Sequence, residues 1–64
     1  MLSNHVYNLL TQLTEEHKSL WRIKEMYLKE ADDCSECKDF WTRMEKDKEA
    51  HVNELKKLVQ THLK

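Results

Sequence analysis

The sequence predicts an all-α fold, an antiparallel helical hairpin that completes a four-helix bundle by homodimerisation. Its 64 residues contain no Gly and no Pro, the residues that tight hairpin turns and phosphate-binding loops require. Apolar residues recur at helical spacing in both halves of the chain, and one polar cluster at residues 31–36 separates the halves. A chain of this length forms one domain, residues 1–64, and buries only about 60% of the surface that it exposes when unfolded.

The first helix is predicted over roughly residues 4–31. Its apolar side chains fall within a sector of about 160° on a helical projection. This sector holds Val6, Leu9, Leu10, Leu13, Leu20, Trp21, Ile23, Tyr27, Leu28 and Ala31. A stripe this wide has more apolar surface than one partner helix covers.

The second helix is predicted over roughly residues 34–63. Asp33-Cys34-Ser35-Glu36 has the spacing of a capping box, with Asp33 as the N-cap and Glu36 at the third helical position. A sector of about 100° holds Phe40, Trp41, Met44, Leu55, Leu58 and Val59. The loop between the helices is short, so they must be antiparallel neighbours in a hairpin about 40 Å long. Because the first helix keeps apolar surface uncovered, we expect a homodimer or, as a further possibility, a protein partner.

Charge and hydropathy argue against several classes of partner. Eleven Lys and Arg against twelve Asp and Glu give a net charge of −1, and the two signs are interleaved, so we expect no nucleic-acid partner. The mean hydropathy is −0.90, and no apolar run approaches the roughly 18 residues of a membrane span. The start of the chain lacks the basic and apolar segments of a secretory signal, so we expect no membrane partner and a cytoplasmic location.

Several polar residues interrupt the apolar faces of both helices. Buried charges are unfavourable unless they are paired, hydrogen-bonded or bound to a metal. The stems of Lys24 and Lys48 can lie on the core while their ammonium groups reach water. His62 lies in the last helical turn, where a cation is favourable. The remaining polar residues need another explanation.

These remaining residues gather at one height of the hairpin and predict a metal site. If the turn is centred near residue 34, positions whose numbers sum to about 68 face each other, so His17 faces His51. Glu16 lies beside them, and Asp47 and Glu54 lie one turn either side of His51. Mixed imidazole and carboxylate ligands suit iron, manganese or zinc. The alternative is a buried hydrogen-bond network without a metal, which fixes register or pairing.

Two segments carry a resemblance to a known family. Leu13-Thr14-Glu15-Glu16-His17-Lys18-Ser19-Leu20 resembles the first helix of hemerythrin-like (HHE cation-binding) domains. The segment from Phe40-Trp41 to Lys48-Glu49-Ala50-His51-Val52-Asn53-Glu54-Leu55 resembles the second, in which an acidic residue follows a His on the same face. The resemblance implies a four-helix bundle that binds two irons between its helices, with this chain as one half and His17, His51 and Glu54 as ligands. Ferritin-like bundles share that architecture.

Cys34 and Cys37 form a Cys-x-x-Cys pair at the start of the predicted second helix, where free N–H groups and the helix dipole favour a thiolate. The pair could be redox-active, form a disulfide, or hold a second metal as half of a Cys₄ site completed in a dimer. Cys37 also lies in the apolar sector, so the thiols could equally be ordinary packing residues.

The sequence therefore predicts a metal-binding hairpin that dimerises into a four-helix bundle, with an iron, manganese or zinc ion as its cofactor. The alternative is a structural or protein-interaction hairpin, in which Trp21, Tyr27, Trp41 and Met44 supply an apolar face. No residue pattern for nucleophilic or hydrolytic catalysis is visible, so no enzymatic activity beyond metal chemistry is predicted.

Overall fold

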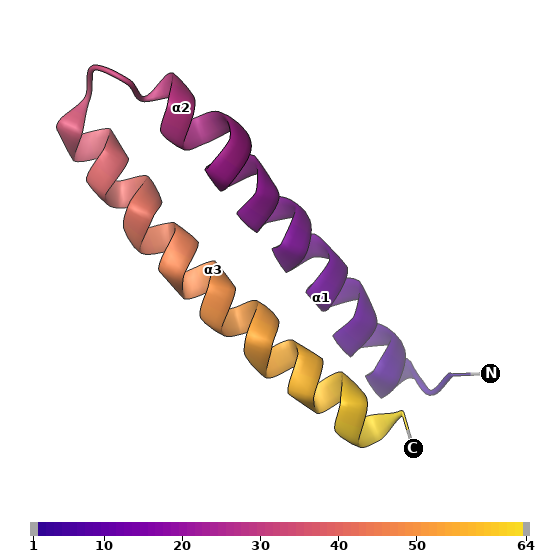
Figure 1. Cartoon of the computed structure of the whole chain (residues 1–64). Helices are drawn as coiled ribbons and strands as arrows, with labels where there is room; N and C mark the ends of the chain where they lie inside the picture. The colour runs from indigo at the N-terminus through magenta and orange to yellow at the C-terminus, as the bar shows by residue number, and fades with distance from the viewer. Residues whose placement is uncertain (1, 64) are drawn as a thin grey trace.

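The computed structural model describes residues 2–63 and is helical in both halves (Figure 1). The first arm runs through α1 (Asn4–Arg22), the π turn η1 (Ile23–Tyr27) and α2 (Leu28–Glu30), and the second arm is α3 (Ser35–His62). The arms lie side by side in opposite directions, so the start of α1 and the end of α3 lie at the same end of the hairpin. The prediction of an all-helical fold is confirmed.

The two arms form a single layer. The molecule measures 48 × 16 × 13 Å and has a radius of gyration of 14.5 Å, whereas a compact domain of this length has a radius of about 11 Å. A single layer covers only one side of each helix. The predicted homodimeric bundle would add the second layer, and it remains a prediction.

No helix within residues 2–63 has both the length and the apolar character needed to cross a membrane.

α1 begins after Ser3, whose hydroxyl accepts a hydrogen bond from the Val6 N–H at 3.2 Å and satisfies one free donor of the first turn.

The core between the arms is small. Tyr27 packs on Trp41 with ring centroids 4.7 Å apart, as the predicted register requires. Among the described residues, the buried apolar side chains are Val6, Leu20, Ile23 and Val59.

The π turn η1 was not predicted from the sequence, because uniform helical spacing cannot reveal it. The Leu28 N–H donates to the carbonyl of Ile23, five residues earlier. Such a turn holds one extra residue and so rotates the side chains that follow it. Lys24, within this turn, reaches across the hairpin to Glu49, with 3.6 Å between Nζ and Oε1. The Lys24 side chain is half-exposed, which agrees with the prediction that its charge reaches water.

α3 begins one residue later than the predicted capping box requires. Cys34 has the extended backbone of an N-cap, and its Sγ accepts a hydrogen bond from the Cys37 N–H at 3.2 Å. Asp33 lies in the preceding turn, so the predicted Asp33 cap is wrong, and Glu36 stands second in the helix instead of third. The N-cap of α3 is therefore a thiol and not the expected carboxylate.

Candidate functional site

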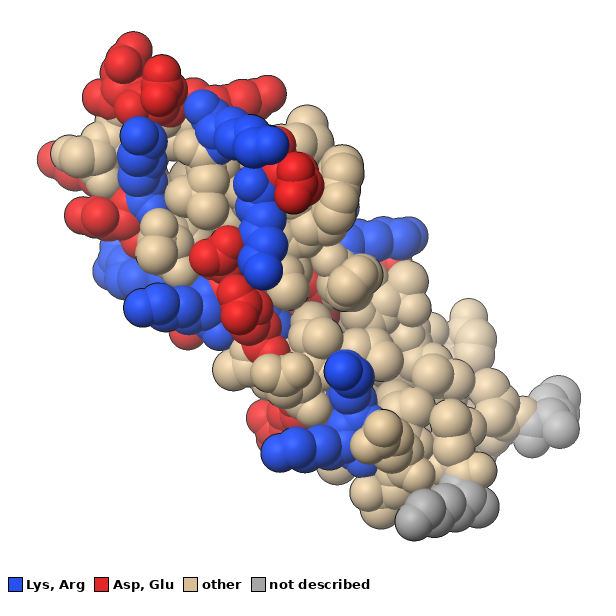
Figure 2. Space-filling model, viewed as in Figure 1, with Lys and Arg blue, Asp and Glu red and all other residues tan. Residues whose placement is uncertain are grey.

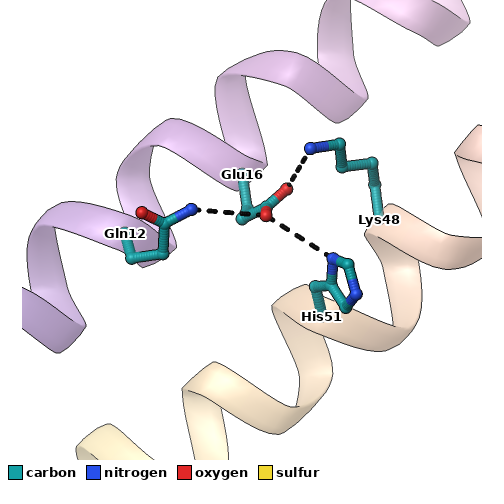
Figure 3. Close-up of polar contacts among 4 residues, drawn as sticks. All are labelled: Gln12, Glu16, Lys48 and His51. Carbon is teal, nitrogen blue, oxygen red and sulfur yellow. Dashed lines mark hydrogen bonds and ion pairs between the residues drawn. The ribbon is translucent and has the colours of Figure 1, made fainter.

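Glu16, near the middle of α1, is the one buried charged side chain within residues 2–63. Its carboxylate lies among three partners (Figure 3). Lys48 Nζ is 2.7 Å from Oε2, His51 Nδ1 is 3.5 Å from Oε1, and Gln12 Nε2 donates to Oε1 at 3.3 Å. We call these four residues the Glu16 network. It joins α1 to α3 at mid-length.

The Lys48 ammonium group keeps the Glu16 carboxylate ionised. Close contact with Lys48 is the main reason that the pKa of Glu16 is lowered; burial opposes this effect, and the contacts with Gln12 and His51 add to it. Oε2 is fully enclosed and has no hydrogen bond of regular geometry. The opposite charge at 2.7 Å is therefore what compensates its loss of water.

Lys48 is the residue whose role the sequence analysis missed. Its ammonium group was expected to reach water, but its side chain is only 22% exposed and lies on a Glu16 side chain that is 11% exposed. The predicted register contained a signal for this pair, because residue 48 lies opposite residue 20 and Glu16 is one helical turn from residue 20.

The five predicted metal ligands are only partly brought together. Glu16 and His51 are in contact, and Glu54 lines the shallow pocket beside them. Asp47 is exposed on α3. His17 directly follows Glu16, and one residue along a helix rotates the side chain by about 100°. His17 therefore lines a different groove from the one that Glu16 and His51 share. The prediction that His17 faces His51 is therefore wrong, although the register on which it depended is right.

Within the described part of the chain, no group of three or more His, Cys, Asp or Glu side chains is placed to hold a metal ion. Glu16 and His51 are two ligands of the kind that iron, manganese or zinc would use. The Lys48 ammonium group already occupies the position beside the carboxylate. Metal binding remains a prediction from the sequence.

A mostly apolar groove runs along the hairpin around His17. It consists of two adjoining hollows that share His17 and Lys18, one of about 600 Å³ that reaches α3 and one of about 390 Å³ that follows α1 into η1. We call this surface the His17 groove. Its lining residues are Leu13, Thr14, His17, Lys18, Trp21, Arg22, Met26, Val52 and Lys56.

Cys34 and Cys37 lie at the turn end of the hairpin, whereas the Glu16 network lies near its middle. Both are free thiols, and their sulfur atoms are 2.7 Å apart. The two predicted features, a polar centre and a thiol pair, are therefore separate sites.

Comparison with known protein families, with curated proteins and with solved structures finds no match to this chain. The resemblance to hemerythrin-like domains thus remains a prediction, and any functional proposal depends on the geometry described above.

Proposed function

We propose that this chain is a self-associating interaction hairpin, in which a second copy covers the His17 groove and completes a four-helix bundle. The observation that supports this is the surface that one hairpin leaves exposed. A compact monomer of 7.8 kDa exposes about 4,400 Å², whereas the hairpin exposes 5112 Å². The excess, about 700 Å², is close to the roughly 800 Å² that each partner contributes to a standard protein interface.

The composition of the groove favours a second copy as its occupant. Trp21 is 57% exposed there, and tryptophan is a frequent anchor of protein interfaces. Only Leu13 and Thr14 of the groove belong to residues 2–14, which contain no Lys, Arg, Asp or Glu, so docking at this end of the groove desolvates few charges. The charged residues of the groove are Lys18, Arg22 and Lys56. In a two-fold dimer the same surface is used by both copies, so one groove is enough to form the interface.

The Glu16 network favours this function over a metal centre. A buried carboxylate needs a compensating charge, and Lys48 supplies one from the same chain. The network then fixes how the two arms of one hairpin fit together, and the His17 groove remains available for the partner.

The test compares two exposed aromatic residues by sedimentation equilibrium over a range of concentrations. Trp21→Lys places a charge in the groove. Phe40→Lys, the matched control, places one at a position that is 48% exposed and outside the groove. We expect the wild type to be a dimer, Trp21→Lys to weaken the dimer by about 30-fold or more, and Phe40→Lys to change its dissociation constant less than threefold.

Two results would contradict the proposal. One is a wild-type protein that stays monomeric at every concentration, which would leave the groove to a different protein. The other is a Phe40→Lys variant that weakens the dimer as much as Trp21→Lys does, which would place the interface on another face. Emission from Trp21 in a Trp41→Phe background gives a second readout, because burial in the dimer should shift it to shorter wavelength with increasing concentration.

A further inference from the structure

The thiol pair at the turn has the geometry of a nucleophile and a resolving group. Cys34 Sγ is the N-cap of α3 and accepts a hydrogen bond from the Cys37 N–H at 3.2 Å, while the two sulfur atoms are 2.7 Å apart. Cys34 precedes the first turn of α3 and Cys37 lies in that turn, with the two thiols in contact, so the pair can close into a disulfide without moving the backbone far. This feature is independent of the His17 groove and of any dimer.

The two thiols differ in their readiness to ionise. Contact with the Cys37 thiol, together with the backbone N–H groups of Cys37 and Glu36, lowers the pKa of Cys34. The same thiol contact raises the pKa of Cys37. The thiolate is the attacking species in disulfide chemistry. Together with the position of Cys34 as the N-cap of α3, where the Cys37 N–H donates to its Sγ, this favours Cys34 as the attacking residue, and Cys37 keeps its proton until a later step.

The pair opens onto a pocket large enough for a small disulfide. The pocket has a volume of about 510 Å³. One side is formed by Tyr27 and Trp41, which pack together and offer an apolar surface. The turn supplies the other side, which contains both cysteines and three acidic residues, Glu30, Asp32 and Asp33.

The charge around this pocket selects among disulfides. Residues 30–36 contain four acidic side chains and no basic one, and acidic residues gather at the turn end of the hairpin in Figure 2. The ammonium group of Lys38 approaches Asp32 no closer than 3.9 Å, which leaves this end with a negative field. A cationic disulfide is attracted to it and an anionic one is repelled.

We propose that Cys34 and Cys37 form a thiol–disulfide exchange site that reduces small disulfides bearing positive charge. The Cys34 thiolate attacks one sulfur of the disulfide, a mixed disulfide forms, and the other sulfur leaves as a thiolate that takes a proton from water. Cys37 then loses its proton to water and attacks Cys34 Sγ. The second substrate thiolate leaves and is protonated. The substrate has gained two electrons and two protons, and the protein holds a Cys34–Cys37 disulfide.

The experiment mixes fully reduced protein with one of three probes and follows the products by intact mass after acid quenching. The probes are cystamine, which is cationic, 2-hydroxyethyl disulfide, which is neutral, and oxidised glutathione, which is anionic. Each rate is divided by the rate of an unstructured cysteine peptide with the same probe. This correction removes the intrinsic reactivity of the disulfide.

Single-cysteine variants assign the two roles. We expect wild-type protein to form the internal disulfide without a lasting adduct and Cys37→Ser to accumulate a mixed disulfide at Cys34. Cys34→Ser should react at least about tenfold more slowly, because its remaining thiol is less ionised. Equal rates for the two variants, or a lasting adduct on wild-type protein, would overturn the proposal.

Charge variants test the selectivity. The corrected rate with cystamine should exceed that with oxidised glutathione by about tenfold at low ionic strength, and the ratio should fall in high salt. Asp32→Asn with Asp33→Asn should lower the cystamine rate and leave the rate with 2-hydroxyethyl disulfide unchanged. An unchanged cystamine rate would refute the charge selection. Protection of all thiols by one zinc ion per two chains would refute the exchange site in favour of a shared Cys₄ metal site.

Discussion

Replacing Lys48 by Met should destabilise the hairpin, because the Glu16 carboxylate would stay between the arms without the charge that compensates it. Met keeps the length and the apolar stem of Lys and removes only the ammonium group. The structure gives the size of the effect from the burial of the pair, the distance between its atoms and the partners that the carboxylate retains.

Two limits bracket the free energy. Breaking a buried ion pair by removing one partner costs about 3–5 kcal/mol, and exposed pairs contribute about 0.2–1 kcal/mol. The side-chain exposures of 11% and 22% place the Glu16–Lys48 pair nearer the buried limit. Gln12 and His51 remain beside the carboxylate, so we expect a loss of about 2 kcal/mol. For a domain of this size that lowers Tm by about 8–16 °C.

The assay is urea denaturation followed by far-ultraviolet circular dichroism at one fixed protein concentration, since dimerisation would make stability depend on concentration. Lys24→Met is the matched control, because it breaks another ion pair between the arms whose side chains are 46% and 47% exposed. We expect Lys24→Met to cost less than about 0.5 kcal/mol. The double variant Glu16→Leu, Lys48→Met should lie within about 1 kcal/mol of wild type, because an apolar pair can replace a buried ion pair. Equal losses for Lys48→Met and Lys24→Met would refute this reasoning.

Three further predictions follow from the same contacts. The pKa of Glu16 is lower in the folded state than in the unfolded one, so its contribution to the free energy of unfolding is complete above about pH 5 and is lost as the pH falls through the folded pKa. Glu16→Gln should therefore flatten the acid limb of a plot of unfolding free energy against pH, and an unchanged limb would contradict this. Because Cys34 caps α3, Cys34→Ala should lower the free energy of unfolding by about 0.5–1 kcal/mol, and Asp33→Ala should lower it by less than half as much, as measured by chemical denaturation. The reverse order would restore Asp33 as the cap. Manganese or zinc should raise Tm more in Lys48→Met than in wild type, because the variant frees the position beside Glu16 and His51; equal shifts would show that the ion binds elsewhere.

Much of the fold could be predicted because apolar spacing and the absence of Gly and Pro act along the whole chain. The register followed from one assumption about the centre of the turn, and the Tyr27–Trp41 contact agrees with it. The π turn at Ile23–Tyr27 could not be predicted, since it changes the spacing over one turn only and leaves the pattern on either side helical. The N-cap was misplaced by one residue because Asp is the stronger capping residue in general, yet the backbone places the Cys34 sulfur on the free N–H group.

The position of the polar centre was predicted correctly, but its members were predicted only in part. Glu16 and His51 interact across the hairpin, as their common height predicted. His17 was included because a projection with a wide apolar sector does not distinguish a residue that points at the partner helix from one at the margin. Lys48 was set aside because long side chains usually carry their charge to water. That rule fails where a buried carboxylate lies within reach, as Glu16 does.

The position of the ion pair matters for register as well as for stability. Sliding α3 by seven residues would keep its apolar stripe against α1, because seven residues are close to two helical turns. That slip would bring Trp41 or Leu55 to the place of Lys48 and leave the Glu16 carboxylate against an apolar side chain. A buried carboxylate without a partner is several kcal/mol less favourable than a paired one. The apolar contacts of so small a core are too few to compensate for that loss. The Glu16–Lys48 pair thus distinguishes the observed alignment of α1 and α3 from alignments shifted by seven residues, whereas the apolar residues alone do not. The same alignment sets the shape of the groove that a second copy would contact.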